Sequence, residues 1–290
     1  MLTILFDGIA YGMLLFVLAV GLAVTLGLMN FINLAHGAFA MVGGYITVLL
    51  MQRAGVPFLA CLPLAFVGAA LLGAALERTL YRPLYHRPHL DQVLFSIGLV
   101  FMAVAGFDYF IGSTQQIMQL PEWLKGRTEI GDGALLLGMG HYRLFIIVVC
   151  AALTVALQYI LGRTRFGSRL RASVDDQRVA AGLGINVNLV FLSTFAVGSG
   201  LAGLGGALGI EVLGLDPTFP LKFMVYFLIV VAVGGTSSIT GPLLAALLLG
   251  IADVAGKYYI PKLGAFIVYC LMIVILIWRP QGLFVRKGGK

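Results

Sequence analysis

Nine apolar stretches follow one another along this chain, and most of its charged residues lie between them. A helix needs about 20 apolar residues to cross the hydrocarbon core of a membrane. Several of the stretches are shorter, which indicates broken or re-entrant helices lined by protein rather than lipid. We therefore expect an all-α, polytopic integral membrane protein with about eight or nine transmembrane or broken helices. The predicted spans are Ile9–Leu28, Ala38–Met51, Phe58–Leu76, Val93–Ile111, Leu144–Leu161, Leu189–Leu208, Phe223–Val233, Pro242–Ala255 and Leu263–Trp278.

The composition excludes other classes of protein. Of the 290 residues, 60% are hydrophobic and 11% are charged, whereas a soluble domain is roughly 45–50% apolar and about 25% charged. Such a chain cannot cover its surface with polar groups, and it is too apolar to stay disordered. The 38 glycines have no collagen period, and they favour close packing of membrane helices. We expect residues 1–290 to form a single membrane domain.

The basic residues predict the orientation. The net charge is +7, and most of the 19 Lys and Arg lie in three short stretches: Arg78–Arg87, Arg163–Arg178 and Arg279–Lys290. Such clusters normally face the cytoplasm. Three crossings before Arg78 then place the N-terminus outside, with Gly112–Arg143 as the larger outer loop. The basic residues form no stripe on a soluble face, so nucleic acid is not an expected partner.

Each candidate motif for a metal, nucleotide or catalytic site lacks a residue or a spacing that the chemistry requires. His86 and His89 have metal-ligand spacing, but Pro88 separates them and no thiolate lies nearby, so we expect no metal site. The string from Gly250 to Tyr258 has the wrong glycine spacing for a phosphate-binding loop and lacks its Ser or Thr. No nucleophile elbow accompanies a Ser, His and Asp set. We expect neither catalytic residues nor a bound cofactor, and therefore no enzyme.

Polar residues interrupt the apolar pattern after the first span. Asn30, Asn33 and His36 recur every three residues and share a face if the segment is helical. Unpartnered polar groups in lipid are costly, so these side chains must face protein or a cavity. They either join neighbouring helices by hydrogen bonds or belong to a translocation pathway or its hinge. Glycines follow them and indicate close helix approach or a break. The candidate residues are Asn30, Asn33, His36, Gly37, Gly43 and Gly44.

Two features of the second half have structural explanations. Overlapping pairs of small residues from Ser199 to Gly209 predict close packing of helix backbones. Asp253 is an intramembrane acid and therefore a functional candidate. Lys257 lies one turn later, and we expect the two side chains to pair.

The second basic stretch is unusual for a plain connector. Ser168 can cap a helix, Arg171 and Asp175 have i,i+4 spacing, and glycines 182 and 184 can end the helix. A cytoplasmic segment over about residues 163–188 can form a short amphipathic helix with Leu170, Val174 and Leu183 on its apolar edge. Such a helix either docks into a groove on a partner or lies at the lipid headgroups.

Four stretches of the chain, taken together, carry a resemblance to a known family. They are Asn33-Leu-Ala-His36-Gly37 with Gly43-Gly44-Tyr45; Arg171-Ala-Ser-Val-Asp175-Asp176 through Gly184-Ile-Asn186; Gly234-Gly235 through Gly241-Pro242; and Arg279-Pro-Gln-Gly-Leu-Phe284. Over almost its whole length the chain resembles the permease subunits of branched-chain amino acid ABC importers, of the hydrophobic amino acid uptake type. The resemblance implies a multi-pass subunit of the bacterial inner membrane. The implied partners are a second, related permease, two ATPases that use the ATP, and a periplasmic solute-binding protein.

The same resemblance implies that Arg169–Asn186 is the coupling helix that receives the ATPase stroke. The residues expected to contact the ATPase are Arg169, Arg171, Asp175, Asp176 and Arg178. Asn30 departs from the small residue expected there, and related permeases carry urea, short amides or aromatic acids, so the substrate class stays open.

Two other classes of membrane protein share some of these features. An ion-coupled secondary transporter would use intramembrane charges such as Asp108 and Asp253. A structural membrane protein needs no path, but the polar groups from Asn30 to His36 argue against it.

Overall fold

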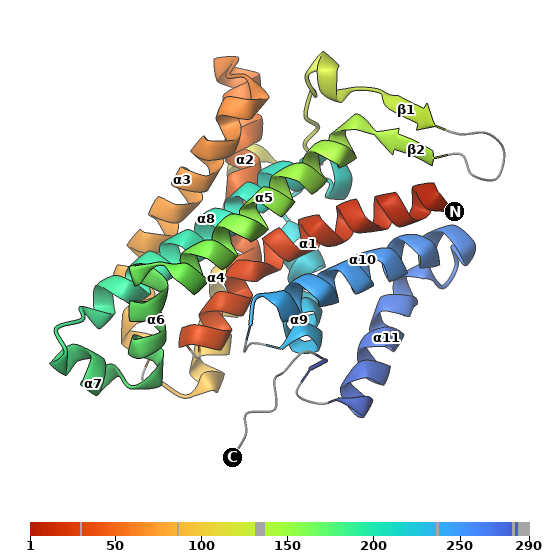
Figure 1. The fold of residues 1–290 in the computed structure, drawn as a ribbon. Coiled ribbons are helices and arrows are strands. Elements are labelled where there is room, and N and C mark those ends of the chain that lie inside the picture. The colour runs from red at the N-terminus through yellow and green to blue at the C-terminus, as the bar shows by residue number, and fades with distance from the viewer. Residues whose placement is uncertain (30, 86, 131–136, 236–237, 280–281, 284–290) are drawn as a thin grey trace.

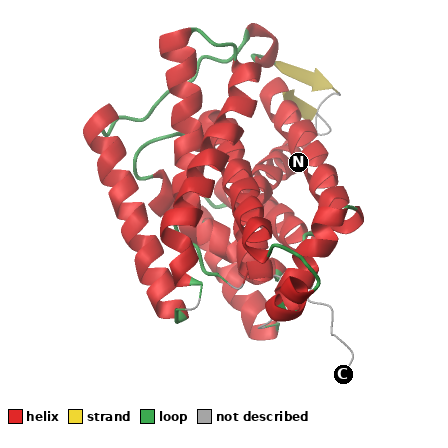
Figure 2. Cartoon of the chain, turned by 90° about the vertical axis from the view of Figure 1, so that its left-hand side faces the viewer, coloured by secondary structure: helices red, strands yellow, loops and turns green. Residues whose placement is uncertain are grey.

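The computed structural model describes residues 1–29, 31–85, 87–130, 137–235, 238–279 and 282–283. These residues form eleven α-helices and one two-stranded hairpin (Figures 1 and 2). The helices are α1 (Leu2–Met29), α2 (His36–Ala54), α3 (Phe58–Leu76), α4 (His89–Ile111), α5 (His141–Arg163), α6 (Arg165–Asp175), α7 (Gln177–Gly182), α8 (Val187–Leu213), α9 (Phe219–Gly234), α10 (Thr240–Tyr259) and α11 (Gly264–Trp278), and the strands are β1 (Arg127–Ile130) and β2 (Leu137–Gly140).

The predicted all-α architecture is confirmed. Each predicted span corresponds to one helix, from α1 to α5 and from α8 to α11. Six of these, α1, α3, α4, α5, α8 and α10, are long and apolar enough to cross a membrane, whereas α9 and α11 are shorter apolar helices. The helix count exceeds the predicted eight or nine because the basic segment adds two short helices, α6 and α7.

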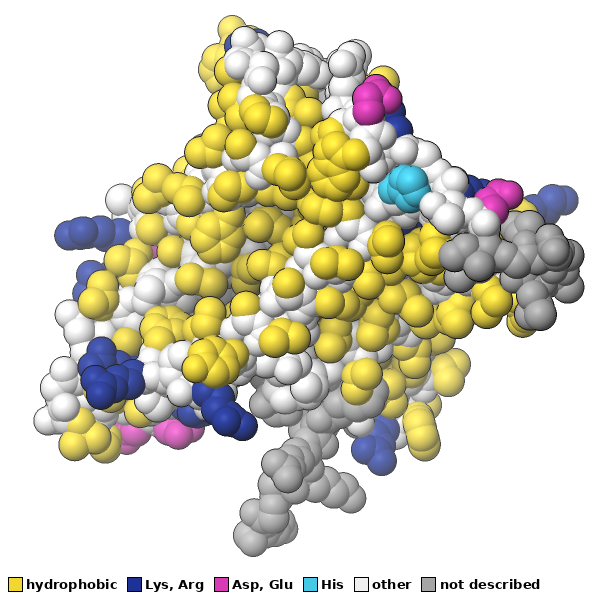
Figure 3. Space-filling view, turned by 45° about the horizontal axis from the view of Figure 1, so that its top comes forward, with side chains coloured by type: hydrophobic (Ala, Val, Ile, Leu, Met, Phe, Trp, Pro, Cys, Tyr) yellow, Lys and Arg dark blue, Asp and Glu magenta, His cyan; other side chains and the backbone are white. Residues whose placement is uncertain are grey.

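The helices differ greatly in how much of their surface is covered. The most apolar window of α1 is 83% buried, whereas that of α4 is only 11% buried. Helix α1 packs against α8 and α10, and α8 also packs against α2 and α3. Apolar side chains on α4 such as Leu94, Phe101 and Met102 are exposed. Figure 3 shows hydrophobic side chains over much of the visible face, with Lys and Arg towards its margins, as expected for a surface that faces lipid.

Glycines allow the backbones of the central helices to pack closely against one another. A Cβ atom added at Gly43 of α2 would lie 2.1 Å from the carbonyl oxygen of Gly203 in α8. One added at Gly206 would lie 1.9 Å from the carbonyl oxygen of Ala40, and one at Gly21 of α1 would lie 2.4 Å from that of Gly198. The predicted close packing through small residues of α8 is therefore confirmed.

The hairpin and the basic segments lie at opposite ends of the bundle. The β1–β2 hairpin lies next to the N-terminus, where the backbone N–H of Gly138 donates to Thr3 Oγ1 at 3.0 Å. Helices α6 and α7 lie at the opposite end (Figure 1). There, Arg78 and Arg82 share a cavity lining with Gln177 of α7. The positions of the first two basic stretches and of the 112–143 loop, at opposite ends of the bundle, agree with the predicted orientation. Most of the third basic stretch, 279–290, lies outside the described residues.

Candidate translocation and coupling sites

The polar residues after α1 lie at a break between two helices. Helix α1 ends at Met29 and α2 begins at His36, while Asn30 lies outside the described residues. Asn33 is not helical, so the condition under which Asn30, Asn33 and His36 would share one helical face is not met. The reason is local: Asn33 Oδ1 accepts a hydrogen bond from the backbone N–H of Ala35 at 3.1 Å. Such a side-chain turn competes with the helical hydrogen-bond pattern.

Asn33 also connects this break to other helices. It is 1% exposed, and its Oδ1 accepts a second hydrogen bond from the hydroxyl of Tyr81 at 3.0 Å. Gln92 of α4 accepts from the backbone N–H of Ile32 at 3.3 Å and donates to the carbonyl oxygens of Leu84 and Arg87. Tyr81 and Gln92 were not among the residues predicted from the sequence. Their position beside the first basic stretch was the available signal, but their partners are far away in sequence.

His36 joins α2 to α1. Its Nε2 lies 2.9 Å from the carbonyl oxygen of Leu18, and its ring stands edge-on to Phe227 of α9. The imidazole fits here because Gly21 has no side chain: a Cβ at that position would lie 2.5 Å from His36 Cε1. His36 is thus buried between three helices with a hydrogen bond made.

The three candidate glycines of α2 lie at three different contacts. Gly37 faces the backbone of Pro220 in α9, Gly43 faces Gly203 of α8, and Gly44 faces the side chain of Leu215. These contacts put the start of α2 against the elements that surround it. Their part in a pathway or hinge remains a prediction.

The predicted coupling helix is two helices instead of one. The chain becomes extended at Asp176 (φ −153°, ψ 108°), which ends α6 and caps α7. Asp176 Oδ1 accepts from the backbone N–H groups of Arg178 and Val179 at 2.8 and 3.0 Å. The expected cap Ser168 is also wrong, because Thr164 is extended and its side chain accepts from Gly167 N. Only a residue just before the first turn can cap it.

One side of this coupling segment is anchored and the other is exposed. Leu170 is buried against Val190 and Phe191 of α8, and Val174 packs on the same cluster. Leu183, expected on this apolar edge, is instead 76% exposed. All five residues expected to contact the ATPase are exposed: Arg169, Arg171, Asp175, Asp176 and Arg178.

The Arg171 side chain does not form the ion pair suggested by its spacing from Asp175. Within the described part of the chain, its guanidinium donates to the carbonyl oxygen of Leu161 at the end of α5. This bond ties α6 to α5. The Asp175 carboxylate is left on the exposed side of α6.

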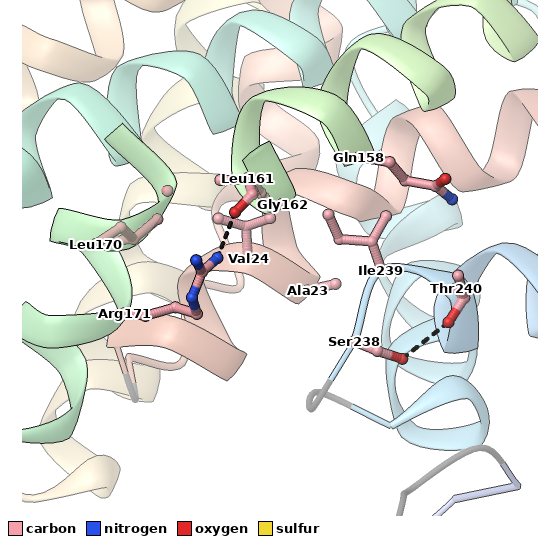
Figure 4. Close-up of a pocket in the computed structure, with 11 residues that line it drawn as sticks. Ala23, Val24, Gln158, Leu161, Gly162, Leu170, Arg171, Ser238, Ile239 and Thr240 are labelled. Atoms are coloured by element: carbon pink, nitrogen blue, oxygen red, sulfur yellow. Dashed lines mark hydrogen bonds between the residues drawn. The ribbon is translucent and has the colours of Figure 1, made fainter. Parts of the chain in front are cut away.

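Two neighbouring cavities lie between the coupling segment and the bundle. The first, of about 380 Å³, is bounded by α1, α5, α6 and the turn before α10 (Figure 4). The second, of about 320 Å³, is bounded by α1, α5, α6 and α8. Both are lined by Val24 and Leu161. They adjoin α6, the first helix of the predicted coupling segment.

The intramembrane acids do not form an open ion site. Asp253 is 2% exposed and pairs with Lys257 at 2.6 Å, as predicted, while the ammonium of Lys257 also lies 5.7 Å from the centre of the Tyr11 ring. Asp108 is exposed near the end of α4. Among the described residues, no group of three or more His, Cys, Asp or Glu could hold a metal ion.

Comparisons with known proteins agree with this architecture. The family described as "Branched-chain amino acid transport system / permease component" matches residues 4–276. The BraD permease protein of the high-affinity branched-chain amino acid transport system of Pseudomonas aeruginosa is 26% identical, covering 97% of this chain and 95% of the relative. A probable branched-chain amino acid transport permease protein LivH of Methanocaldococcus jannaschii is 28% identical over 97% and 91% of the two chains.

A second type of relative also matches. The LivM permease protein of Escherichia coli K12 is 26% identical, covering 93% of this chain and 68% of the relative. No solved structure matches the chain. Because the family covers nearly the whole helical bundle, this chain belongs to the branched-chain amino acid transport permease family.

Proposed function

We propose that this protein is the permease subunit of an ATP-driven ABC importer for branched-chain or other small hydrophobic amino acids. Its proposed partners are two ATPases, a second related permease and a periplasmic solute-binding protein, and its location is the bacterial inner membrane. The observation that carries the proposal is the coupling segment, whose charged residues are exposed at the basic end of a chain of this family. The existence of both LivH and LivM relatives supports a pair of permeases.

The anchoring of the coupling segment suggests how an ATPase stroke reaches the bundle. A partner that grips Asp175 and Arg178 moves α6, and Leu170 carries that motion to α8 through Val190 and Phe191. Helix α8 packs against α1, α2 and α3. A displacement of α8 therefore shifts the helices on either side of the α1–α2 break. We place the pathway or hinge at this break, at Asn33, His36 and Gly37. The charged contact and the gate are thus connected by packed helices.

Charge reversal of the coupling segment tests the proposal. The chain is purified with the proteins it retains, reconstituted into vesicles and assayed for ATP-dependent leucine uptake. Asp175→Lys is the informative variant, because Asp175 is exposed and forms no cap. We expect loss of uptake and of its coupling to ATP hydrolysis, with membrane insertion unchanged. Glu122→Lys, an exposed reversal in the outer loop, is the matched control.

Two results count against the proposal. Normal uptake by Asp175→Lys contradicts the coupling role. Uptake driven by a proton or sodium gradient without ATP identifies an ion-coupled transporter instead. Competition by urea, short amides and aromatic acids determines the substrate class, and leucine, isoleucine and valine are expected to compete best.

A further inference from the structure

The cavity in Figure 4 has an apolar floor and a polar rim. Ala23, Val24 and Leu170 are buried and form part of its floor, whereas Gln158 and Arg171 are exposed at its edge. Ser238 and Thr240 complete the rim, where their hydroxyl oxygens lie 3.1 Å apart. Its volume of about 380 Å³ falls in the range typical of small-molecule sites. Arg171 lies on one side of the cavity, and Ser238 and Thr240 lie on the opposite side (Figure 4).

The charge of the lining selects an anionic group. Arg171 is the one charged residue among those that line this cavity in the described part of the chain. One of its nitrogens donates to Leu161, which leaves other donors of the planar guanidinium for a ligand. A carboxylate is the natural partner, because it can accept two parallel hydrogen bonds from one guanidinium.

The remaining surface fits the other parts of an amino acid. The neighbouring cavity of about 320 Å³ is almost wholly apolar and shares Val24 and Leu161 with the first. An aliphatic side chain can lie on the apolar floor of the first cavity, against Ala23, Val24 and Leu170. The oxygens of Gln158, Ser238 and Thr240 can accept hydrogen bonds from an ammonium group.

We propose that this cavity binds a small apolar amino acid from the cytoplasmic side, with its carboxylate on Arg171, and that its occupancy inhibits transport. The inference rests on the proposed function, in which such an amino acid is the cargo. A bound molecule bridges α6 to the turn before α10 and holds the coupling segment against the bundle. The importer thereby senses the product that accumulates inside the cell.

A cavity-filling variant tests the site without touching its charged groups. Gly162 lines the cavity, and a Cβ added there meets no atom within 4 Å. We therefore expect the larger side chain of Gly162→Leu to fit without a clash and to narrow the ligand space. Gly106→Leu on α4 is the matched control, because an added Cβ there also meets no atom within 4 Å. Arg171→Met separately removes the carboxylate partner.

Binding of radiolabelled L-leucine to the full chain in lipid nanodiscs is the primary measurement, because it does not depend on transport. We expect saturable binding by the wild type and Gly106→Leu, and affinity weaker by roughly tenfold or more in Gly162→Leu and Arg171→Met. Leucinamide, which lacks the carboxylate, should not compete. In vesicles carrying the complete importer, leucine sealed at the cytoplasmic side should slow uptake by the wild type but not by Gly162→Leu, whose uptake in empty vesicles stays normal.

Three results overturn the inference: no saturable leucine binding by the wild type, unchanged binding by Gly162→Leu, or equal competition by leucinamide. If leucine binds as described but the complete importer transports no amino acid, the proposed function fails while the site stands. If leucine uptake is normal but the chain does not bind leucine saturably, the proposed site is contradicted and the proposed function stands.

Discussion

The hydroxyl of Tyr81 donates a 3.0 Å hydrogen bond to Asn33 Oδ1, which ties the break between α1 and α2 to the π-helical turn Glu77–Tyr81 that follows α3. Both side chains are buried, and 48 residues separate them in the chain. We expect Tyr81→Phe to lower the free energy of unfolding by about 1 kcal/mol, the usual net value of one such bond. Thermal unfolding in detergent measures the loss. Tyr159→Phe, at a position 63% exposed, should leave the melting temperature unchanged, and equal melting of both variants would show that the bond contributes nothing.

The packing of α8 on α2 predicts a large difference between two glycine substitutions. Gly206→Ala brings a Cβ against the carbonyl of Ala40, and the helices must separate. Overpacking of this kind costs about 1–3 kcal/mol. Gly106→Ala meets open space and should be neutral or stabilising, because alanine favours the helix by up to about 1 kcal/mol over glycine. Thermal unfolding of the two variants decides the point, and similar stabilities would contradict the close contact.

The Asp253–Lys257 pair predicts that removing the lysine alone destabilises the protein more than removing both side chains. In Lys257→Met, the buried carboxylate of Asp253 loses its cation. Because the Lys257 side chain is 53% exposed, we expect a loss below the roughly 3–5 kcal/mol that breaking a fully buried pair costs. In the double variant Asp253→Leu/Lys257→Met no charge is left behind, so we expect stability near that of the wild type. A double-mutant cycle on unfolding measures the coupling. Additive losses would mean that the two side chains act independently.

The capping of α7 predicts a local defect. Asp176→Ala removes the acceptor for the Arg178 and Val179 N–H groups and should cost about 1 kcal/mol. Asp176→Asn keeps an acceptor oxygen and should lose much less. Hydrogen exchange of the 177–182 amides reports the difference, which should be confined to this helix. Equal exchange in the two variants would exclude the cap as the cause.

The loop between α8 and α9 predicts a dependence of stability on pH. Burial by itself raises the pKa of Asp216, but hydrogen bonds from Lys222 and Thr218 outweigh it and hold that pKa below its ordinary value. The ionised carboxylate therefore stabilises the folded state at neutral pH, and this contribution declines below the ordinary pKa of about 3.9 and is lost as the pH falls through the lowered pKa. The difference in melting temperature between wild type and Asp216→Asn should shrink on acidification through this window. A constant difference would show that the charge is unimportant.

The number and position of the apolar helices could be predicted from the sequence, as the agreement between the predicted spans and α1 to α5 and α8 to α11 shows. Hydropathy suffices because a membrane requires each crossing segment to satisfy its own backbone hydrogen bonds. The i,i+4 pair of Asp253 and Lys257 was predictable for a similar reason, since one helical turn fixes the distance between the side chains.

The candidate sites depended on contacts that no local pattern contains. Whether Asn33 continues a helix or leaves it was decided by the turn to Ala35 and by Tyr81, which only folding brings near. The split of the coupling segment followed from the extended backbone at Asp176, and its anchoring depended on Val190 and Phe191. Sequence alone determined that the chain crosses a membrane and which segments between its spans are basic, because hydrophobicity and charge are properties of segments. The tertiary structure decided which polar side chains are partnered and where cavities remain, because hydrogen bonds and packing act between segments distant in the chain.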